Sequence, residues 1–428
     1  MAIHVVNEAR RCLHCKVPQC RKGCPINTNI PEAIELFRTG HKDQAGKMLF
    51  ENNPLSVICS LVCDHEKQCE GHCIFARKGA PVHFSSIENY ISDAYLDHLQ
   101  LQIEPKRGQR VAIIGSGPAG ITISVILAQR GYDITLFESR DRIGGVLRYG
   151  IPEFRLPNRI VDVEIDNLRK MGVHFQTDCI IGKTLSIEQL ENSGFKGIFV
   201  GSGAGLPNFM NIPGENAINI MSSNEYLTRV NLMNAADPTT DTPINLGKRV
   251  VVVGGGNTAM DSCRTAKRLG ADVTIVYRRS EAEMPARLEE VKHAKEEGIR
   301  FLTLHNPVEY IADERGAVKQ AVLEVMRLGE PDDSGRRRPE PTGRTVTIDT
   351  DQVIVAVGVS PNPLVPKSVA GLELGRKNTI VVDDNMRSSR SDLFAGGDIV
   401  RGGATVILAM GDGRKAAASM DKQLQGKN

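Results

Sequence analysis

Val111-Ala-Ile-Ile-Gly-Ser-Gly-Pro-Ala-Gly120 is the stretch that decides the fold of this chain. Its four leading apolar residues are typical of a buried strand in a parallel sheet. The pattern Gly115-x-Gly117-x-x-Gly120 then opens a helix. The first glycine permits a tight turn, the second lets a pyrophosphate approach the backbone, and the third lets helix and strand pack closely. We therefore expect a Rossmann-like dinucleotide-binding domain here.

The residues after this stretch support the same interpretation. A second strand is expected at residues 133–137, and it ends at Glu138, about 20 residues beyond the glycines, where a carboxylate accepts hydrogen bonds from ribose hydroxyls. The helix N-terminus presents its positive dipole end to the phosphates. The candidate FAD-binding residues of this segment are Gly115, Gly117, Pro118, Ala119, Gly120 and Glu138.

A second strand–glycine–helix unit contains Gly254-x-Gly256-x-x-Ala259. Its next strand, expected at residues 273–277, ends in Arg278-Arg279 instead of an acid. An arginine fork binds a 2′-phosphate, and each charge-assisted hydrogen bond contributes roughly 1.5–3 kcal/mol. We expect NADP(H), with NAD(H) as the alternative. Arg287 is a weaker candidate for the 2′-phosphate, and we expect it on a helix surface. The candidate residues are Gly254, Gly255, Gly256, Asn257, Thr258, Ala259, Arg278 and Arg279.

The C-terminal part returns to the first domain. An apolar run at residues 353–357 leads to Gly358, and Phe394-Ala-Gly-Gly-Asp398 ends another strand before Thr405 and a helix expected from about Gly413. Asp398 is either a turn residue or a ligand of the flavin's polyol chain, beside Gly397 and Thr405. The expected segments are an iron–sulfur domain (1–104), a discontinuous FAD domain (105–244 and 351–428) and a NAD(P)H domain (245–350).

Eight of the ten cysteines form two runs near the N-terminus. The first is Cys12-x2-Cys15-x4-Cys20-x3-Cys24, followed by Pro25, and the second is Cys59-x3-Cys63-x5-Cys69-x3-Cys73. A cysteine run that ends in Cys-Pro is typical of [4Fe–4S] ferredoxins. Zinc sites favour two C-x2-C pairs, and disulfides favour secreted domains. We expect a helical domain with two [4Fe–4S] clusters; zinc and disulfides remain alternatives.

Glu88 has two interpretations. Ser85-Ser-Ile-Glu88 opens an amphipathic helix, and a capping box would direct the carboxylate back to the Ser85 amide. Alternatively, the carboxylate is an oxygen ligand to one cluster. The isolated Cys179 and Cys263 are expected to be core thiols.

Composition excludes several classes. The chain has 428 residues, a net charge of +2, 4% aromatic residues and no Trp, which gives no support for nucleic-acid binding. No apolar stretch approaches 18 residues, so membrane insertion is not expected. Thiol-rich chemistry without a leader predicts the cytoplasm. The run Arg336-Arg-Arg338 is expected at a solvated hairpin tip.

Together these motifs resemble the small (beta) subunit of glutamate synthase. The chain is similar also to the N-terminal half of dihydropyrimidine dehydrogenase and to the large subunit of bifurcating NADH-dependent ferredoxin:NADP oxidoreductase. The matching segments are Cys12-Leu-His-Cys15, Gly23-Cys-Pro-Ile26, Cys69-Glu-Gly-His-Cys73, Gly144-Gly-Val-Leu-Arg-Tyr-Gly-Ile-Pro-Glu-Phe-Arg-Leu-Pro157, Gly254-Gly-Gly-Asn-Thr-Ala-Met-Asp261, Tyr277-Arg-Arg-Ser280, Met284-Pro-Ala286 and Ala395-Gly-Gly-Asp398.

The resemblance implies interleaved ligand sets. One cluster would take Cys12, Cys15, Cys20 and Cys73, and the other Cys24, Cys63, Cys69 and Glu88. Cys59 would then be a spare thiol. The resemblance also implies that Gly145, Leu147 and Gly358 contribute to the FAD site.

The resemblance further implies the activity. NAD(P)H would give a hydride to FAD, and single electrons would pass through two [4Fe–4S] clusters to a larger subunit carrying FMN or another acceptor, or to ferredoxin. No protein side chain is expected to be catalytic, because FAD carries the hydride chemistry. The alternatives are a subunit of a bifurcating or ferredoxin-linked NADP oxidoreductase, and the NAD(P)H-oxidising subunit of a dihydropyrimidine dehydrogenase.

Overall fold

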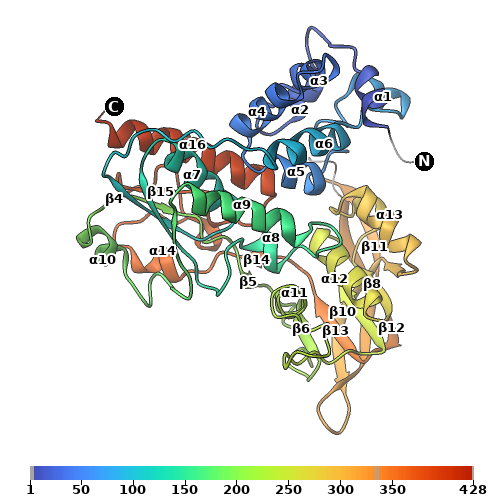
Figure 1. Ribbon diagram of the computed structural model, residues 1–428. Coiled ribbons are helices and arrows are strands. Elements are labelled where there is room, and N and C mark those ends of the chain that lie inside the picture. Colours follow the sequence, from blue (N-terminus) through green and yellow to red (C-terminus); the bar gives the residue numbers. More distant parts are fainter. Residues whose placement is uncertain (1–3, 333–334, 336, 427–428) are drawn as a thin grey trace. The chain divides into compact units, whose positions relative to one another are not determined.

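The computed structural model describes residues 4–332, 335 and 337–426. The chain divides into two compact units (Figure 1). The first contains residues up to 148, residues 153–205 and residues from 360 onward; the second contains residues 149–152 and 206–359. The first unit is discontinuous in sequence because the chain leaves it after residue 205 and returns at residue 360.

The N-terminal part of the first unit is a group of short helices around an apolar core. The helices are α1 (Val5–Arg10), α2 (Gln19–Gly23), α3 (Ile30–Arg38), α4 (Lys42–Asn52), α5 (Ser56–Val62), the 3-10 turn η1 (Ile74–Lys78) and α6 (Phe84–Leu96). Ile34, Leu49, Ile87 and Ile91 are buried in the middle of this group. Several thiols lie at the edge of the same core, which places the cysteine runs beside apolar side chains.

The rest of the first unit is a parallel five-stranded sheet covered by helices. The strand order is β15-β4-β1-β2-β3. The strands are β1 (Arg110–Ile114), β2 (Asp133–Phe137), β3 (His174–Gln176), β4 (Phe195–Val200) and β15 (Leu393–Ala395). The helices are α7 (Pro118–Gln129), α8 (Val146–Tyr149), α9 (Asn158–Lys170), α10 (Ile187–Asn192), α14 (Leu364–Ser368), η3 (Arg376–Asn378), α15 (Asp398–Arg401) and α16 (Val406–Leu424). The sheet confirms the expected α/β class with a discontinuous first domain.

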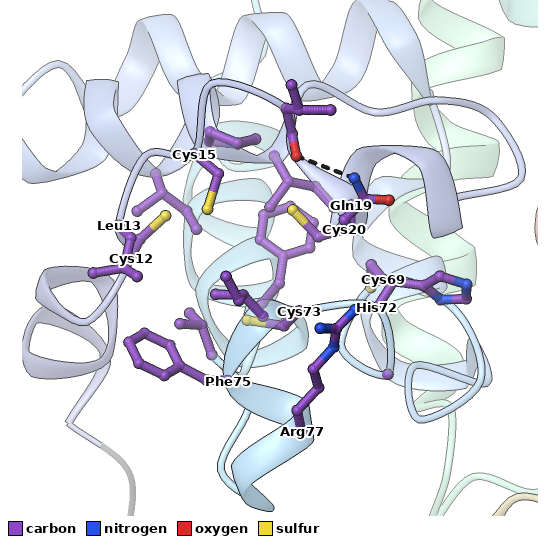
Figure 2. Close-up of a pocket in the computed structure, with 18 residues that line it drawn as sticks. Cys12, Leu13, Cys15, Gln19, Cys20, Cys69, His72, Cys73, Phe75 and Arg77 are labelled. Carbon is purple, nitrogen blue, oxygen red and sulfur yellow. Dashed lines mark hydrogen bonds between the residues drawn. The ribbon is translucent and has the colours of Figure 1, made fainter.

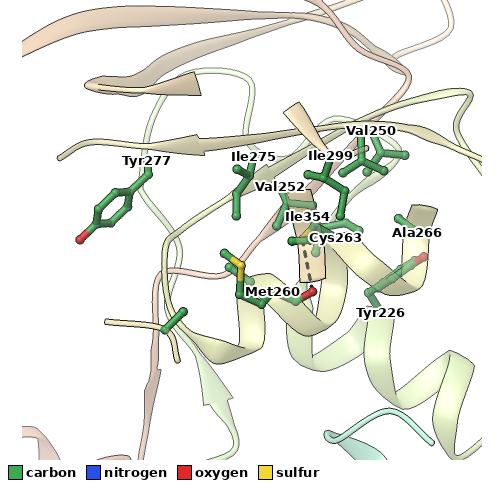
Figure 3. Packing of buried hydrophobic residues seen from close by; sticks show 14 of the residues in the cluster. Tyr226, Val250, Val252, Met260, Cys263, Ala266, Ile275, Tyr277, Ile299 and Ile354 are labelled. Atoms are coloured by element: carbon green, nitrogen blue, oxygen red, sulfur yellow. Dashed lines mark hydrogen bonds between the residues drawn. The ribbon is translucent and has the colours of Figure 1, made fainter. Parts of the chain in front are cut away.

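The second unit contains another parallel sheet, with strand order β6-β13-β7-β8-β9. Its strands are β6 (Ile220–Ser222), β7 (Arg249–Val253), β8 (Asp272–Tyr277), β9 (Arg300–Thr303) and β13 (Gln352–Val355); its helices are α11 (Ser223–Asn231), α12 (Asn257–Arg268), η2 (Glu281–Glu283) and α13 (Leu288–Glu296). Val250, Val252 and Ile275 from the sheet pack against Met260 and Cys263 of α12 (Figure 3). The run of β-branched residues in β7 favours a strand that is buried on both faces.

An antiparallel sheet of order β10-β11-β12 is inserted before β13. Its strands are β10 (His305–Ala312), β11 (Val318–Pro331) and β12 (Arg337–Asp349), and β5 (Leu206–Pro207) with β14 (Val359–Ser360) forms a separate two-stranded sheet. β12 lies at the edge of its sheet and is mostly exposed. Of the predicted basic tip, Arg337 and Arg338 are exposed, and Arg336 lies outside the described residues.

The apolar run at residues 353–357 forms strand β13 only as far as Val355. One expected boundary was wrong. The helix expected from about Gly413 begins at Val406, and Gly413 lies inside it. There a Cβ would approach the Ala119 carbonyl oxygen to 2.5 Å, so this glycine lets α16 pack closely against α7 instead of starting a helix. A glycine that permits close helix packing and one that lies at a helix boundary give the same sequence signal.

No helix of the described residues combines the length and the apolar character that a membrane span requires.

Candidate functional site

Five cysteines line one cavity in the N-terminal helical part. Cys12, Cys15, Cys20 and Cys73 border a space of about 400 Å³, and Figure 2 shows their sulfur atoms grouped there. Cys69, which the resemblance assigned to the other cluster, also lines this cavity. The rest of the lining is mainly apolar and includes Leu13, Val17, Gln19, Ile30, Pro31, Ile34, Ile74, Phe75, Val82 and Phe84. A cavity of this kind fits a group larger than a single ion, with thiolate ligands on several sides.

The thiols of this cavity also interact electrostatically. Burial raises the pKa of Cys20 to about 11, with further upward contributions from Cys73, Cys12 and Cys15. Burial likewise raises the pKa of Cys12, and Cys15 and Cys73 add to the increase. Cationic iron would offset this penalty because metal binding removes the thiol protons. The structure thus brings together the four cysteines that the resemblance assigned to one cluster, with Cys69 of the other set beside them, and their ligation stays a prediction.

Three members of the second expected ligand set, Cys63, Cys69 and Glu88, are buried, and Cys24 is half-buried. Burial raises the pKa of Cys69, and Glu88, Glu70 and Cys24 raise it further. The pKa of Cys63 is raised chiefly by its hydrogen bond with Cys59, then by burial, Cys59, Glu88 and Cys69. Electrostatic interactions therefore connect all four members of the second expected set, Cys24, Cys63, Cys69 and Glu88.

All ten cysteines are free thiols, which contradicts the disulfide alternative. Cys179 and Cys263 are buried, as expected for core thiols. Among the described residues, no group of three or more His, Cys, Asp or Glu side chains is arranged around a single metal-ion position.

The capping-box interpretation of Glu88 was wrong. α6 begins at Phe84, so Ser85 lies inside the first turn and not at the N-cap. The Ser85 amide donates to Glu70 Oε1 at 2.9 Å, and the His83 amide donates to Glu8 Oε1 at 2.8 Å. The amides at the start of α6 therefore donate to two acids from other segments, Glu70 and Glu8, and not to Glu88.

Glu88 is instead turned into the protein. It is 7% exposed. Burial raises its pKa well above the usual range, and Cys59 and Glu70 add to this increase. A buried carboxylate beside thiols fits an oxygen ligand to iron, since a cation would hold it in the charged form.

The first glycine loop has the geometry that its sequence predicts. Gly115 has φ +96°, and a Cβ there would lie 2.4 Å from the Gly201 carbonyl oxygen. A Cβ on Gly120 would lie 1.9 Å from the Gly115 carbonyl oxygen. A Cβ on Gly117 would meet no atom of the described residues within 4 Å, so the loop is open at the position expected for the pyrophosphate. Pro118 and Ala119 form the first turn of α7.

Glu138 organises this loop. One carboxylate oxygen accepts from the Ser116 amide (3.0 Å) and hydroxyl (2.5 Å), and the other accepts from the Ser139 hydroxyl and the Arg140 amide, both at 3.0 Å. The Ser116 hydroxyl in turn accepts from the Gly144 amide at 2.9 Å. Since amides and serine hydroxyls already donate to both oxygens, a ribose hydroxyl would replace one of the serine donors.

The two flavin-site residues that only the resemblance implied lie beside the same loop. A Cβ on Gly145 would lie 2.7 Å from the Gly117 Cα, which places this backbone against the pyrophosphate position. Leu147 is fully buried. Gly358 follows β13 in the second unit, where its carbonyl oxygen accepts from the Asn208 amide at 3.1 Å; its role toward FAD stays a prediction.

The C-terminal turn is held by residues that the sequence did not reveal. Asp412 is 1% exposed, and its Oδ2 accepts from the Gly397 amide at 3.0 Å. Arg401 donates to both carboxylate oxygens of Asp412, at 2.8 and 2.6 Å. Asp398 Oδ1 accepts from the Ala404 amide at 2.9 Å, and burial raises the pKa of Asp398. No periodicity marks Asp412, because its partner lies 15 residues away in a turn.

Thr405 is the N-cap of α16. The short helix α15 and residues 402–404 separate the Gly397 turn from the N-terminal end of α16, and all of these belong to one continuous segment.

The second glycine loop is built like the first. Gly254 has φ +140°, and a Cβ there would lie 2.3 Å from the Ala356 carbonyl oxygen. A Cβ on Gly255 would lie 2.7 Å from the Tyr277 ring, and a Cβ on Gly256 would approach Pro285 Cγ to 4.0 Å and no other atom of the described residues as closely. Asn257, Thr258 and Ala259 form the first turn of α12. The loop remains open beside Gly256, as a bound pyrophosphate requires.

The expected position of Arg287 was wrong. Its side chain is 4% exposed, not on a helix surface, and its amide donates to Asn257 Oδ1 at 2.9 Å. The preceding Ala286 amide donates to the Gly255 carbonyl oxygen at 3.1 Å, so this segment lies over the glycine loop. Arg278 is exposed and Arg279 half-buried at the end of β8.

Glu164 of α9 is a buried acid that the sequence also did not reveal. It is 1% exposed, and its Oε1 has no hydrogen-bond partner among the described residues. Burial raises its pKa from 4.5 to about 8, and Cys59 makes a smaller contribution. The unfolded chain releases this proton near pH 4.5 and the folded chain near pH 8, so the free energy of unfolding falls as the pH rises between these values.

We expect Glu164→Gln to remove this penalty. The variant should be more stable by about 3 kcal/mol at pH 7, with no gain below about pH 4.5 and a constant gain above about pH 8. Urea denaturation across this range measures the difference. Glu188→Gln, at an exposed position of α10, is the control and should show no such profile. An equal gain at pH 4 and pH 8 would contradict the assignment.

Comparisons with known proteins agree with this architecture. Residues 109–413 match the family model of pyridine nucleotide-disulphide oxidoreductases, and residues 2–99 match that of dihydropyrimidine dehydrogenase domain II, 4Fe-4S cluster. The second match confirms an iron–sulfur domain over the zinc alternative. The fold resembles FprA of Mycobacterium tuberculosis in complex with NADPH, with a TM-score of 0.62 and 18% identity over 75% of this chain and 85% of that one.

Several relatives match nearly the whole chain, and two of them illustrate the likeness. The glutamate synthase [NADPH] small chain of Halomonas elongata is 35% identical over 96% of this chain and 88% of its own length. The putative oxidoreductase AegA of Escherichia coli is 36% identical over 96% of this chain, which spans 64% of AegA. The resemblance expected from the sequence is confirmed: the chain belongs to the family of the glutamate synthase small chains, flavin-type pyridine nucleotide-disulphide oxidoreductases with an N-terminal 4Fe-4S domain.

Proposed function

We propose that this chain is an electron-input subunit that oxidises NADPH and passes single electrons to a partner. The observation that carries the proposal is the combination of two open glycine loops with two groups of neighbouring thiols in one polypeptide. The name of the Halomonas relative, a small chain of an NADPH-dependent synthase, supports the same role. When bound, FAD converts a hydride into two electrons, and [4Fe–4S] clusters carry electrons one at a time.

The chain's own residues bind and orient these groups. In the first unit the Gly115–Gly120 loop and Glu138 hold the dinucleotide, and the Gly397 turn, fixed by Asp412, and the N-terminus of α16 hold the flavin end. Cys12, Cys15, Cys20 and Cys73 would bind one cluster, and Cys24, Cys63, Cys69 and Glu88 the other. In the second unit the Gly254–Ala259 loop would hold NADPH.

The acceptor is either a larger subunit carrying FMN or another acceptor, or ferredoxin. Co-purification separates them: a stoichiometric large subunit supports the first, and a protein active alone with ferredoxin supports the second.

Anaerobic dye reduction tests the proposal. The purified, FAD-loaded chain should reduce an artificial dye with NADPH as the donor, in the absence of any partner. Failure to do so with FAD demonstrably bound would refute the electron-input role.

Arg278 and Arg279 give a test of cofactor choice. Removing either guanidinium deletes one or two charge-assisted hydrogen bonds to a 2′-phosphate, each contributing roughly 1.5–3 kcal/mol. The KM for NADPH in dye reduction should therefore rise about ten- to a thousandfold in Arg278→Gln and in Arg279→Gln, while the KM for NADH stays constant. Arg338→Gln, at an exposed site in β12, is the control. Equal losses with both nucleotides would show that these arginines are structural.

A further inference from the structure

Helix α16 contacts the loop at residues 24–29, here called the Cys24 loop, through Arg414. No sequence motif identified Arg414. The half-buried guanidinium donates through Nη1 to the Asn52 carbonyl oxygen (2.8 Å) and Oδ1 (2.5 Å), and through Nη2 to the Ile26 carbonyl oxygen (3.2 Å). Gly411, one turn earlier, permits this approach, since a Cβ there would lie 3.1 Å from Ile26 Cγ2. The side chain thus ties the last helix of the first unit to the iron–sulfur segment of the same unit.

These contacts continue to the sulfur of Cys24. Because Arg414 holds Asn52 Oδ1, the other end of the amide, Nδ2, donates to Thr28 Oγ1 at 2.9 Å. Thr28 is 4% exposed, and its Oγ1 lies 3.3 Å from Cys24 Sγ. The thiol donates in this contact. Once Cys24 binds iron as a thiolate it has no proton, so the Thr28 hydroxyl becomes the donor to sulfur.

The positive charge of Arg414 favours the reduced form of the cluster, as does the hydrogen bond from Thr28 to Cys24. The Arg414 guanidinium interacts electrostatically with Cys24 and stays protonated at any working pH. One-electron reduction adds a negative charge to a cluster. A nearby cation and a hydrogen bond to a ligating sulfur both stabilise the reduced form, and both are known determinants of cluster potential.

We propose that Arg414, Asn52 and Thr28 form a relay that positions Cys24 and raises the reduction potential of the cluster that Cys24 binds. The proposal rests on the proposed function for the assignment of Cys24 as an iron ligand. It deepens that function because it names three positioning residues that set how readily this cluster accepts an electron. The same helix, α16, carries Asp412, so one element fixes both the Gly397 turn and the Cys24 loop.

Redox titration of the clusters tests the relay. Each cluster is titrated in the full chain with dithionite and mediators and followed by EPR. We expect Thr28→Val and Arg414→Gln each to lower the equilibrium constant for reduction of one cluster about tenfold, which is about 59 mV for a one-electron couple. The other cluster should keep its potential. Arg414→Lys retains the charge without the fork geometry and should give a smaller shift.

Lys415→Gln is the matched control, because it removes the same charge from the next residue of α16, which is exposed. Its potentials should equal those of the parent protein. If Arg414→Gln does not fold, the near-isosteric Thr28→Val, which leaves Arg414 in place, carries the test.

Unchanged potentials in Thr28→Val would overturn the relay, and so would a parent protein that holds no iron after anaerobic reconstitution. Failure of NADPH to reduce the dye would instead refute the electron-input role. The two failures are distinguishable because dithionite, not NADPH, sets the potentials in the titration.

Discussion

Replacing Glu88 with alanine should reduce the iron content of the anaerobically reconstituted protein from about eight to about four atoms per chain. The carboxylate lies in the buried group that contains Cys63 and Cys69, and no other oxygen ligand is assigned to that cluster. A cubane that loses one of four ligands at a buried site dissociates or loses iron. Iron and sulfide analysis, with EPR of the reduced protein, measures the result.

Two control variants separate ligation from folding. Cys59→Ala removes the neighbouring thiol and should retain about eight irons, with a small loss of stability from the missing sulfur. Glu70→Gln weakens the cap of α6 at the Ser85 amide and should also retain both clusters. If Cys59→Ala loses a cluster and Glu88→Ala does not, Cys59 is the eighth ligand and the assignment of Glu88 is wrong.

Replacing Gly117 with valine should weaken FAD binding strongly while leaving the fold intact. Gly117 is the N-cap of α7, with an extended backbone (φ −72°, ψ −175°) that a β-branched residue adopts readily. Apart from its chain neighbours, no described atom lies within 4 Å of an added Cβ, so the side chain would extend into the space expected for the pyrophosphate. The affinity for FAD should fall by about a hundredfold or more, equivalent to about 2.7 kcal/mol. Flavin content after purification and titration of the apoprotein measure this loss.

Gly120→Ala is the contrasting variant. Its Cβ would lie 1.9 Å from the Gly115 carbonyl oxygen, so helix and strand must separate at a cost of about 1–3 kcal/mol or more. Thermal unfolding of the two apoproteins should therefore show a lowered Tm for Gly120→Ala and an unchanged Tm for Gly117→Val. A Gly117→Val protein that retains FAD would show that the dinucleotide does not lie over this loop.

The features predicted correctly from the sequence are those with a local signal. The strand at residues 133–137 has its predicted bounds, and β1 and β8 begin one residue before the predicted strands, because each is a short apolar run closed by a turn. The glycine loops were equally predictable, since the required backbone angles and close approaches leave little choice of residue.

The features that were missed depend on partners distant in sequence. Glu70 caps a helix 15 residues away, Glu8 reaches a residue 75 positions away, and Asp412 holds a turn 15 residues away. None of these acids lies in a periodic pattern, so only the folded chain identifies its partner. Arg287 was misplaced for the same reason, because an isolated arginine is normally a surface residue and its burial depends on the neighbouring glycine loop.

The outer strand β12 has a consequence for how the protein behaves in concentrated solution. An unpaired row of amide and carbonyl groups is a template on which another polypeptide can add a strand and begin a fibre. β12 carries Pro339 and Pro341, which lack an amide hydrogen, and the exposed cations Arg337, Arg338 and Arg344. The prolines cannot donate the hydrogen bonds that intermolecular strand pairing needs, and the arginines repel other copies of the chain. The edge strand β12 therefore resists self-association, although it is long and exposed to solvent.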